Sequence, residues 1–310
     1  MESALAKAEA KQGGDEADFE QNPSGGEASL MKNRLPMAEQ EDALKQLTGD
    51  RHFELGCEAS NIVYKEPNVM RENGLMYGVS GSFVYYGWIP LLPFNYYAWL
   101  PSLPEDRNKS QSMVKLEGKF STGQVDYRNS GTIDDIRDYM LEARALVGPV
   151  FYNRKIATIP YLGLGYRYLN DDSGGKISST GAYGYERESN YYYIPIGVNL
   201  ITDFNHGWFL ETNTEFDIFL GGRQISHLSD VVPEFNDLSN NQEDGYGLRG
   251  SLKIRKGFET VDFIIEPFIK YWNIKKSEIS NLTYNNVIIG YGYEPKNNST
   301  EYGIKLAMQF

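Results

Sequence analysis

The stretch TEYGIKLAMQF, residues 300–310, ends the chain and decides the predicted fold. Large apolar side chains occupy every second position: Tyr302, Ile304, Leu306, Met308 and Phe310. The positions between them hold Glu301, Gly303, Lys305, Ala307 and Gln309. Successive side chains of a β-strand point to opposite faces, so this segment would have one face suited to lipid and one polar face. The pattern predicts a transmembrane β-strand.

The same alternation recurs upstream in nine further segments. Residues 208–220, for example, place Trp208, Phe216 and Ile218 on one face, and Glu211 and Glu215 on the other. The nine segments are 53–63, 77–85, 114–120, 139–147, 162–168, 192–200, 208–220, 248–255 and 262–271. With the final strand they predict an all-β fold, an antiparallel transmembrane β-barrel of ten strands.

The connections distinguish a membrane barrel from a soluble one. Short turns at 153–154, 205–207 and 257–259 alternate with long polar stretches at 170–188, 223–243 and 276–297. Short turns on one side and long loops on the other are typical of outer-membrane barrels. An even strand count returns the C-terminus to the short-turn side. We therefore expect a protein of the cell outer membrane, in contact with its lipid, with both termini periplasmic.

One connection does not fit this scheme. The link Trp88–Ser112 falls where a short periplasmic turn is expected, yet it is long and contains four prolines and the aromatic run FNYYAW at 94–99. Either it is an insertion at the inner membrane face, which its aromatic residues favour, or the strand count is wrong by one hairpin.

Composition excludes several other classes of protein. No window approaches the roughly 18–20 unbroken apolar residues that a membrane helix needs. The net charge of −12 argues against a nucleic-acid partner. Cys57 is the only cysteine, and the three histidines, His52, His206 and His227, are far apart in sequence. We therefore expect no cofactor and no metal site.

The first 51 residues differ from the rest of the chain. They are rich in Glu, Ala, Lys and Gly and contain one aromatic residue, Phe19. Such a segment cannot bury enough apolar surface to offset the entropy of ordering it. We expect residues 1–51 to form a disordered periplasmic leader that is flexible or partly helical, since 36–47 has the pattern of a short helix. The alternative is a periplasmic segment that plugs the barrel or contacts a partner. Residues 52–310 are expected to form the barrel.

The final strand, with its terminal Phe310, resembles the C-terminal signal of bacterial outer-membrane β-barrel proteins. The segments LEGKFSTGQVDY (116–127), GLGYRYLNDD (163–172) and ERESNYYYIP (186–195) resemble a group of such barrels. The general architecture is similar to that of omptins and OmpA-type barrels. This resemblance implies a location and a fold but no activity. It also implies that the barrel-assembly machinery reads Tyr302, Ile304, Leu306, Met308 and Phe310.

Inward-facing positions of the predicted strands carry many charges of both signs. The acids are Glu54, Glu58, Glu117, Glu142, Glu211, Glu215, Asp217, Asp262, Glu266 and Glu301. The bases are Lys115, Lys119, Arg144, Arg167, Arg249, Lys253, Arg255, Lys270 and Lys305. An unpaired buried charge costs several kcal/mol, so charges confined in a narrow lumen should pair. We predict a charge network that largely closes the lumen.

Three functions remain open on this basis. The first is a structural or surface-interaction barrel with a closed lumen, whose long loops, rich in Tyr and Asn, bind a surface ligand. The second is a narrow channel for small polar solutes. The third is a hydrolase in an outer loop, where Ser226–Asp230 (SHLSD) is the candidate. Adjacent Ser and His residues rarely face one another, so we expect no catalytic residues and no enzymatic activity.

Overall fold

The computed structural model describes residues 48–49, 51–87, 111–153 and 156–310. The barrel belongs to the unit Ala38–Phe310. The predicted leader at 1–51 therefore lies almost wholly outside the described residues, as does the predicted helix at 36–47. No helix in the described part of the chain is long and apolar enough to cross a membrane.

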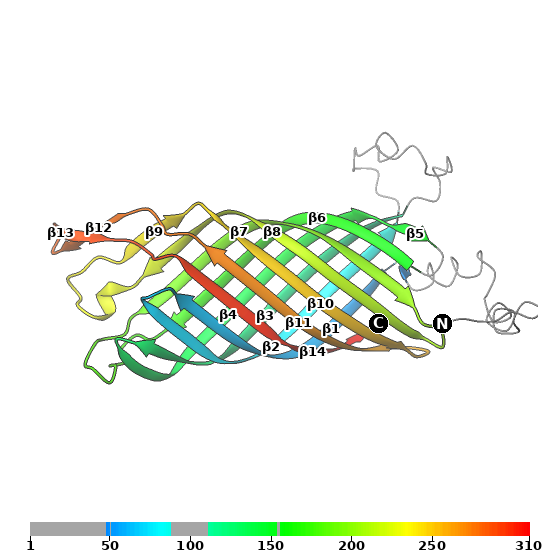
Figure 1. Cartoon of the computed structure of the whole chain (residues 1–310), viewed down its shortest axis with the longest axis horizontal. Helices are drawn as coiled ribbons and strands as arrows, with labels where there is room; N and C mark the ends of the chain where they lie inside the picture. Colours follow the sequence, from blue (N-terminus) through cyan, green and yellow to red (C-terminus); the bar gives the residue numbers. More distant parts are fainter. Residues whose placement is uncertain (1–47, 50, 88–110, 154–155) are drawn as a thin grey trace, which may run out of the picture. The chain divides into compact units, whose positions relative to one another are not determined.

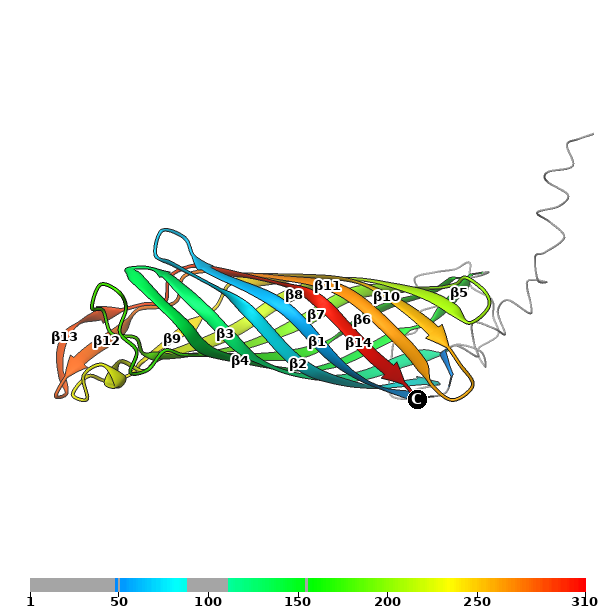
Figure 2. The ribbon, with the colours of Figure 1, turned by 90° about the horizontal axis from the view of Figure 1, so that it is seen from below.

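Ten long strands form a closed antiparallel barrel, tilted against its axis (Figures 1 and 2). They are β1 (Arg51–Glu66), β2 (Met70–Gly87), β3 (Ser112–Asn129), β4 (Gly131–Pro149), β6 (Ile156–Asp172), β7 (Glu186–Asp203), β8 (Trp208–Ser226), β10 (Gly245–Gly257), β11 (Asp262–Ile274) and β14 (Asn297–Gln309). Each pairs with its neighbours in chain order, and β14 pairs with β1 to close the barrel. Phe310 completes the closure through backbone hydrogen bonds of 2.9 and 3.1 Å with Phe53. The predicted ten-strand barrel is confirmed.

Shorter secondary-structure elements lie at the two ends of the barrel. They are β5 (Phe151–Asn153), the 3₁₀ helix η3 (Leu228–Asp230), β9 (Leu238–Gln242), β12 (Ser280–Tyr284) and β13 (Val287–Gly292). We call the end with Phe310 and the turn 204–207 the short-turn end. The long-loop end carries loops 173–185, 227–244 and 275–296, and the last of these holds the β12–β13 hairpin (Figure 1).

The connection 88–112 proves to be an insertion and not a missed hairpin. β2 pairs directly with β3 over seventeen residue pairs, from Arg71 with Arg128 to Gly87 with Ser112. The strand count is therefore correct. The expected position of this connection at the membrane face concerns residues 88–110, which lie outside the described part.

Large apolar side chains face outward in the half of the barrel near the short-turn end. All five outward residues of the final strand are exposed: Tyr302, Ile304, Leu306, Met308 and Phe310. The same holds for Phe53 and Leu55 of β1, and for Phe263 and Ile265 of β11. A contiguous apolar belt of this extent is unstable in water and matches the hydrocarbon layer of a bilayer. The predicted lipid-facing parity is confirmed.

Tyrosines border this belt on its long-loop side. Tyr139 lies against Tyr168, with ring centroids 5.8 Å apart, and Tyr166 lies 5.2 Å from Tyr192. Beyond them the outward residues become polar and exposed: Arg71, Asn73, Gln124, Arg137 and Arg223. The barrel strands have 13 to 19 residues, whereas about 9–11 span a bilayer. The barrel therefore extends well beyond the membrane on its long-loop side, since tyrosine rings mark the interface.

The interior also contains three buried apolar clusters that the sequence reading did not predict. One fills the short-turn end, between Val84, Tyr86, Met113, Leu146 and Ile159 among others. The other two lie toward the long-loop end, and their members are Ile62, Met76, Val125, Ile136 and Met140, and Tyr191, Tyr193, Phe219, Trp272 and Ile274.

Candidate functional site

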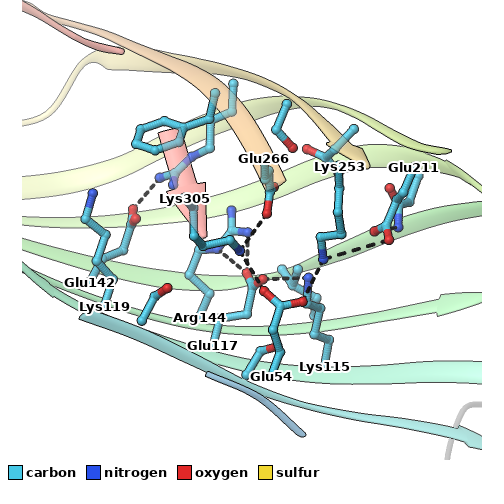
Figure 3. A pocket seen from close by; sticks show the side chains of 18 of the residues that line it. Glu54, Lys115, Glu117, Lys119, Glu142, Arg144, Glu211, Lys253, Glu266 and Lys305 are labelled. Atoms are coloured by element: carbon cyan, nitrogen blue, oxygen red, sulfur yellow. Dashed lines mark hydrogen bonds and ion pairs between the residues drawn. The ribbon is translucent and has the colours of Figure 1, made fainter. Parts of the chain in front are cut away.

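The middle of the lumen is crossed by one connected set of ion pairs, which we call the central network. Its acids are Glu58, Glu117, Glu142, Glu215, Asp217 and Glu301, and its bases are Lys115, Lys119, Arg144, Arg249 and Lys270. They come from β1, β3, β4, β8, β10, β11 and β14, because each lies on the inward parity of its strand. Figure 3 shows several of these side chains pointing toward one another across the barrel.

Two arginines make the cross-lumen contacts. Arg144 of β4 contacts Glu117 of β3 through Nε, at 2.8 Å, and also reaches Glu215 of β8. Arg249 of β10 contacts Asp217 at 2.7 Å and Glu215 at 3.0 Å, and it reaches across to Glu142 of β4. Neither β8 nor β10 is a neighbour of β4 in the barrel, so these pairs span the bore. Charge-assisted bonds of this kind are strong and directional.

Two lysines continue the network to the other wall. Lys270 of β11 lies 3.4 Å from Glu142 and 3.7 Å from Glu301. Lys119 of β3 contacts Glu301 of β14 and Glu58 of β1. Each lysine is therefore shared between two carboxylates on different strands, and the network connects seven of the ten barrel strands.

A second group of charges lies nearer the short-turn end. Glu54 accepts from Lys253 at 2.9 Å and from Lys305 at 2.7 Å, and Lys305 also contacts Glu266 at 2.6 Å. Glu211 lies 3.8 Å from Lys253. Beside them, Arg255 pairs with Asp262 at 3.0 Å. Members of both groups line a cavity of about 140 Å³, seen in Figure 3, which has room for water but is bounded mainly by charged and polar side chains.

Arg167 is the one base of the predicted network for which the described residues provide no ion pair. It is buried, with contacts to Ser299 Oγ at 3.4 Å and Met140 Sδ at 3.7 Å. Its guanidinium lies 5.5 Å from the centre of the Trp272 ring, a cation–π arrangement. The expected pairing fails here because Arg167 lies at the level of the aromatic cluster. The other eighteen predicted lumen residues each form at least one ion pair.

A further charged cluster, which the sequence reading missed, lies in the lumen at the long-loop end. Arg187 contacts Glu66 at 2.9 Å, Glu72 at 2.8 Å and Asp171 at 2.7 Å. We call these four residues the Arg187 cluster. The sequence reading placed Asp171 in an exposed loop, which is wrong: Asp171 belongs to β6 and is buried. Alternation alone could not have located it, because both faces of β6 carry polar residues after Leu169.

The segment SHLSD (Ser226–Asp230), the candidate for hydrolysis, does not place a serine hydroxyl against the histidine ring. Both ring nitrogens of His227 contact carboxylates: Nε2 lies 2.9 Å from Glu188 and Nδ1 lies 3.0 Å from Asp237. Ser229 donates its hydroxyl to Asp237 at 2.7 Å and not to the imidazole. Asp230 accepts from the backbone N–H of Glu186 at 3.0 Å. A serine nucleophile in this segment would need His227 as its base, and the contacts of both His227 ring nitrogens go to carboxylates instead.

The electrostatics around His227 follow from these contacts. Partial burial alone would lower the pKa of His227, but the hydrogen bonds to Glu188 and Asp237 outweigh it and raise the pKa above its ordinary value. Partial burial would raise the pKa of Asp237, whereas the hydrogen bonds from Ser229 and His227 lower it. The contacts therefore favour an imidazolium held between two carboxylates.

Comparison with known proteins supports the fold and nothing finer. The chain matches no protein-family model and no curated protein. Among solved structures it is similar to the outer membrane protease OmpT from Escherichia coli, with a TM-score of 0.55 and 10% sequence identity over 84% of this chain and 96% of that chain. The chain has the fold of an outer-membrane β-barrel. It also resembles the translocator domain of the autotransporter NalP from Neisseria meningitidis, with a TM-score of 0.42 and 12% identity over 90% and 95% of the two chains.

The ten-strand architecture of this outer-membrane barrel is therefore omptin-like, as the sequence resemblance implied. At 10% identity the likeness concerns the path of the backbone and does not carry residues across. What the barrel does has to be argued from its own side chains.

Proposed function

We propose that the protein is a non-conducting, non-enzymatic outer-membrane barrel that serves as a surface-interaction platform. In this proposal the short-turn end and both termini face the periplasm, and the long-loop end projects outside the cell. The observation that carries the closed lumen is the pair of cross-lumen arginines, Arg144 and Arg249, whose carboxylate partners lie on opposite walls. The protruding half of the barrel is what it presents to its surroundings.

Several features support a lumen that does not conduct. The central network lies between apolar clusters on both sides, so a solute would have to part ion pairs and also pass buried aromatic and aliphatic side chains. Breaking a buried ion pair costs about 3–5 kcal/mol. An open aqueous bore needs no such balance of charges.

The β12–β13 hairpin supports an interaction with a partner protein. Val287, Ile288 and Ile289 are consecutive and are 65%, 55% and 55% exposed. Both faces of the hairpin tip are therefore apolar, because neighbouring residues of a strand point to opposite sides. Tyr291, 72% exposed, continues the surface. Apolar groups in such an exposed loop mark a contact site, and their chemistry fits an apolar patch on another protein.

Conductance in planar bilayers tests the closed lumen. We expect the purified barrel to give no stable single-channel steps at neutral pH. A variant that combines Glu142→Ala, Arg144→Ala and Arg249→Ala should give steps, because it removes the cross-lumen contacts. The matched control, Lys275→Ala with Asp244→Ala, removes an exposed pair and should stay silent. Stable steps from the unmodified protein would instead establish the narrow channel.

Cysteine labelling tests the orientation. In a Cys57→Ser background, Gly290→Cys in β13 of the hairpin should react in intact cells with a maleimide that does not cross membranes. A Cβ at Gly290 meets no atom within 4 Å, so the change is tolerated. Phe258→Cys, in an exposed turn at the short-turn end, should react only after lysis. The opposite pattern would reverse the proposed orientation.

Adhesion of cells that display the barrel tests the surface role. The variant Val287→Ser/Ile288→Ser/Ile289→Ser should reduce attachment to protein-coated surfaces. Lys275→Ala serves as the control for a change elsewhere in the same loop region. Unchanged attachment by the triple variant, with normal surface display, would contradict the role assigned to the hairpin.

A further inference from the structure

A group of three possible metal ligands lies at the long-loop end, on the outer wall of the barrel, and is independent of the closed lumen. Glu186 and Glu188 of β7 and His227, which follows β8, each offer a ligand atom, and these atoms lie within 4.8 Å of one another. All three side chains are partly buried. We propose that they form a binding site for one divalent transition-metal ion, Zn²⁺ being the ion that the donor set fits best.

The backbone fixes this triad. Arg187 pairs with Ser226 across β7 and β8, and the N–H of His227 donates to the carbonyl of Glu186 at 2.9 Å. Glu188 lies two residues along the same face of β7. Arg187, between the two glutamates, points into the lumen, where its partners are Glu66, Glu72 and Asp171. The nearest arginine therefore does not neutralise the two outward carboxylates.

The side chains behind the triad are arranged as in metal sites. His227 Nδ1 faces Asp237 at 3.0 Å, and Ser229 fixes Asp237 in turn. A histidine that ligates a metal through one nitrogen usually donates from the other to a carboxylate, which sets its tautomer and raises its basicity. Glu188 Oε2 accepts from the Tyr168 hydroxyl at 2.9 Å, which leaves Oε1 directed at the imidazole.

Asn170 supplies an observation that points to a ligand independently of the triad. It is 2% exposed and donates its amide to Glu186 Oε1 at 2.6 Å. Its carbonyl oxygen Oδ1 is buried and has no hydrogen-bond partner among the described residues. A buried oxygen without a partner is costly, and this one belongs to a side chain that touches a proposed ligand.

The donor set selects the kind of metal. One imidazole with two carboxylates suits Zn²⁺ and leaves a coordination position open, whereas Ca²⁺ prefers six to eight oxygens. Zinc bonds of about 2.1 Å place tetrahedral ligand atoms about 3.4 Å apart. The present 2.9 Å between His227 Nε2 and Glu188 Oε1 therefore has to widen by only about half an ångström. Binding would displace the proton that these two atoms share.

Zinc titration of the refolded full-length barrel in detergent, after chelation, tests the site. The unmodified protein should bind one equivalent of Zn²⁺, and Co²⁺ in its place should give visible absorption typical of a low-symmetry, four- or five-coordinate site. His227→Ala and Glu188→Gln should each abolish the stoichiometric binding. Asp237→Asn, which affects only the support of His227, should weaken it by about 10–100-fold.

Two controls keep the outcome decisive. His206→Asn removes a histidine from a turn at the other end and keeps a residue that tolerates its positive φ of 54°; it should bind as the unmodified protein does. Heat-modifiable migration on gels shows that each variant is folded. Binding that survives His227→Ala in a folded barrel, or that is lost equally in His206→Asn, would overturn the proposal, as would the absence of any stoichiometric binding to the unmodified protein.

Discussion

The central network and the Arg187 cluster are built from the same residue types but differ in their balance of acids and bases. In the central network six acids meet five bases, and four of the bases, Lys119, Arg144, Arg249 and Lys270, are each held by carboxylates from different strands. In the Arg187 cluster a single guanidinium serves Glu66, Glu72 and Asp171. The central network is nearly neutral and connects opposite walls of the barrel, whereas the Arg187 cluster retains excess negative charge.

This difference predicts different responses to the same kind of mutation. A balanced network loses stability at any ordinary pH when one base is removed, because several buried carboxylates lose their compensation at once. An acid-rich cluster has a further response, since lower pH can neutralise the carboxylates that remain. The following predictions use this contrast.

The largest effect is expected from Arg249→Met. Methionine keeps much of the volume but leaves Glu142, Glu215 and Asp217 without their shared guanidinium. We expect a loss of about 3–5 kcal/mol in the free energy of unfolding, measured by urea titration of the refolded barrel at pH 8 and pH 5. Lys275→Ala, in an exposed pair, is the control and should change it by at most about 1 kcal/mol. Equal effects of the two variants would show that the central network does not hold the walls together.

Arg187→Met should have a smaller effect that depends on pH. It leaves three carboxylates uncompensated near the solvent-exposed end, and we expect a loss of about 3 kcal/mol at pH 8. The loss should shrink at pH 5, because the carboxylates can take up protons in place of the guanidinium. The same urea titrations measure it. A loss independent of pH would place this cluster in the same class as the central network.

Glu294 should make the long-loop end sensitive to pH, with the smallest effect of the three. Burial, followed by the nearby charge of Glu66, raises its pKa from 4.5 to about 7. A pKa raised in the folded state contributes stability that is fully present below the unfolded value and is lost as the pH rises through the folded value. Hydrogen exchange in 275–296 should therefore become faster between pH 5 and pH 8, after correction for the intrinsic rate.

The matched variant for this effect is Glu294→Gln. It keeps the size of the side chain and the contact with Tyr64, 3.1 Å away, but cannot ionise. The corrected exchange should then become nearly independent of pH. A pH dependence that persists in this variant would assign the effect to another group, and His227 is one candidate because its pKa is also raised.

Much of the barrel was predictable from alternation alone. The outward parity of Phe53, Leu116, Leu164, Ile196 and Phe263 was read correctly because lipid selects large apolar side chains at every second position. The inward charges were found by the same rule. The partner of each charge could not be predicted. Arg144 and Glu215 are 71 residues apart, and sequence spacing does not show which inward residues lie at the same level along the barrel axis.

The sequence-based prediction failed where the two faces of a strand do not differ in polarity. Toward the long-loop end both faces of β6 and β7 carry polar residues, so Asp171 and Arg187 were not recognised as buried. Trp272 and Tyr193, on the inward parity, meet edge to face with centroids 5.0 Å apart, and this aromatic packing in the lumen was also missed. Similarly, the apolar tip of the β12–β13 hairpin was read as part of a polar loop.

By itself the sequence determined the ten strands, their lipid-facing sides and the terminal strand that ends at Phe310, because all three follow from a local two-residue period. The tertiary structure alone decided which charges meet and where His227 points. The register of β7 and β8 shifts at Tyr192/Tyr193, opposite Leu220–Gly221, and Gly221 adopts a φ of 154°. A bulge adds one residue and reverses the parity that follows. Strict alternation from Trp208 would turn His227 toward the lumen, whereas the bulge places it on the outer wall beside Glu188.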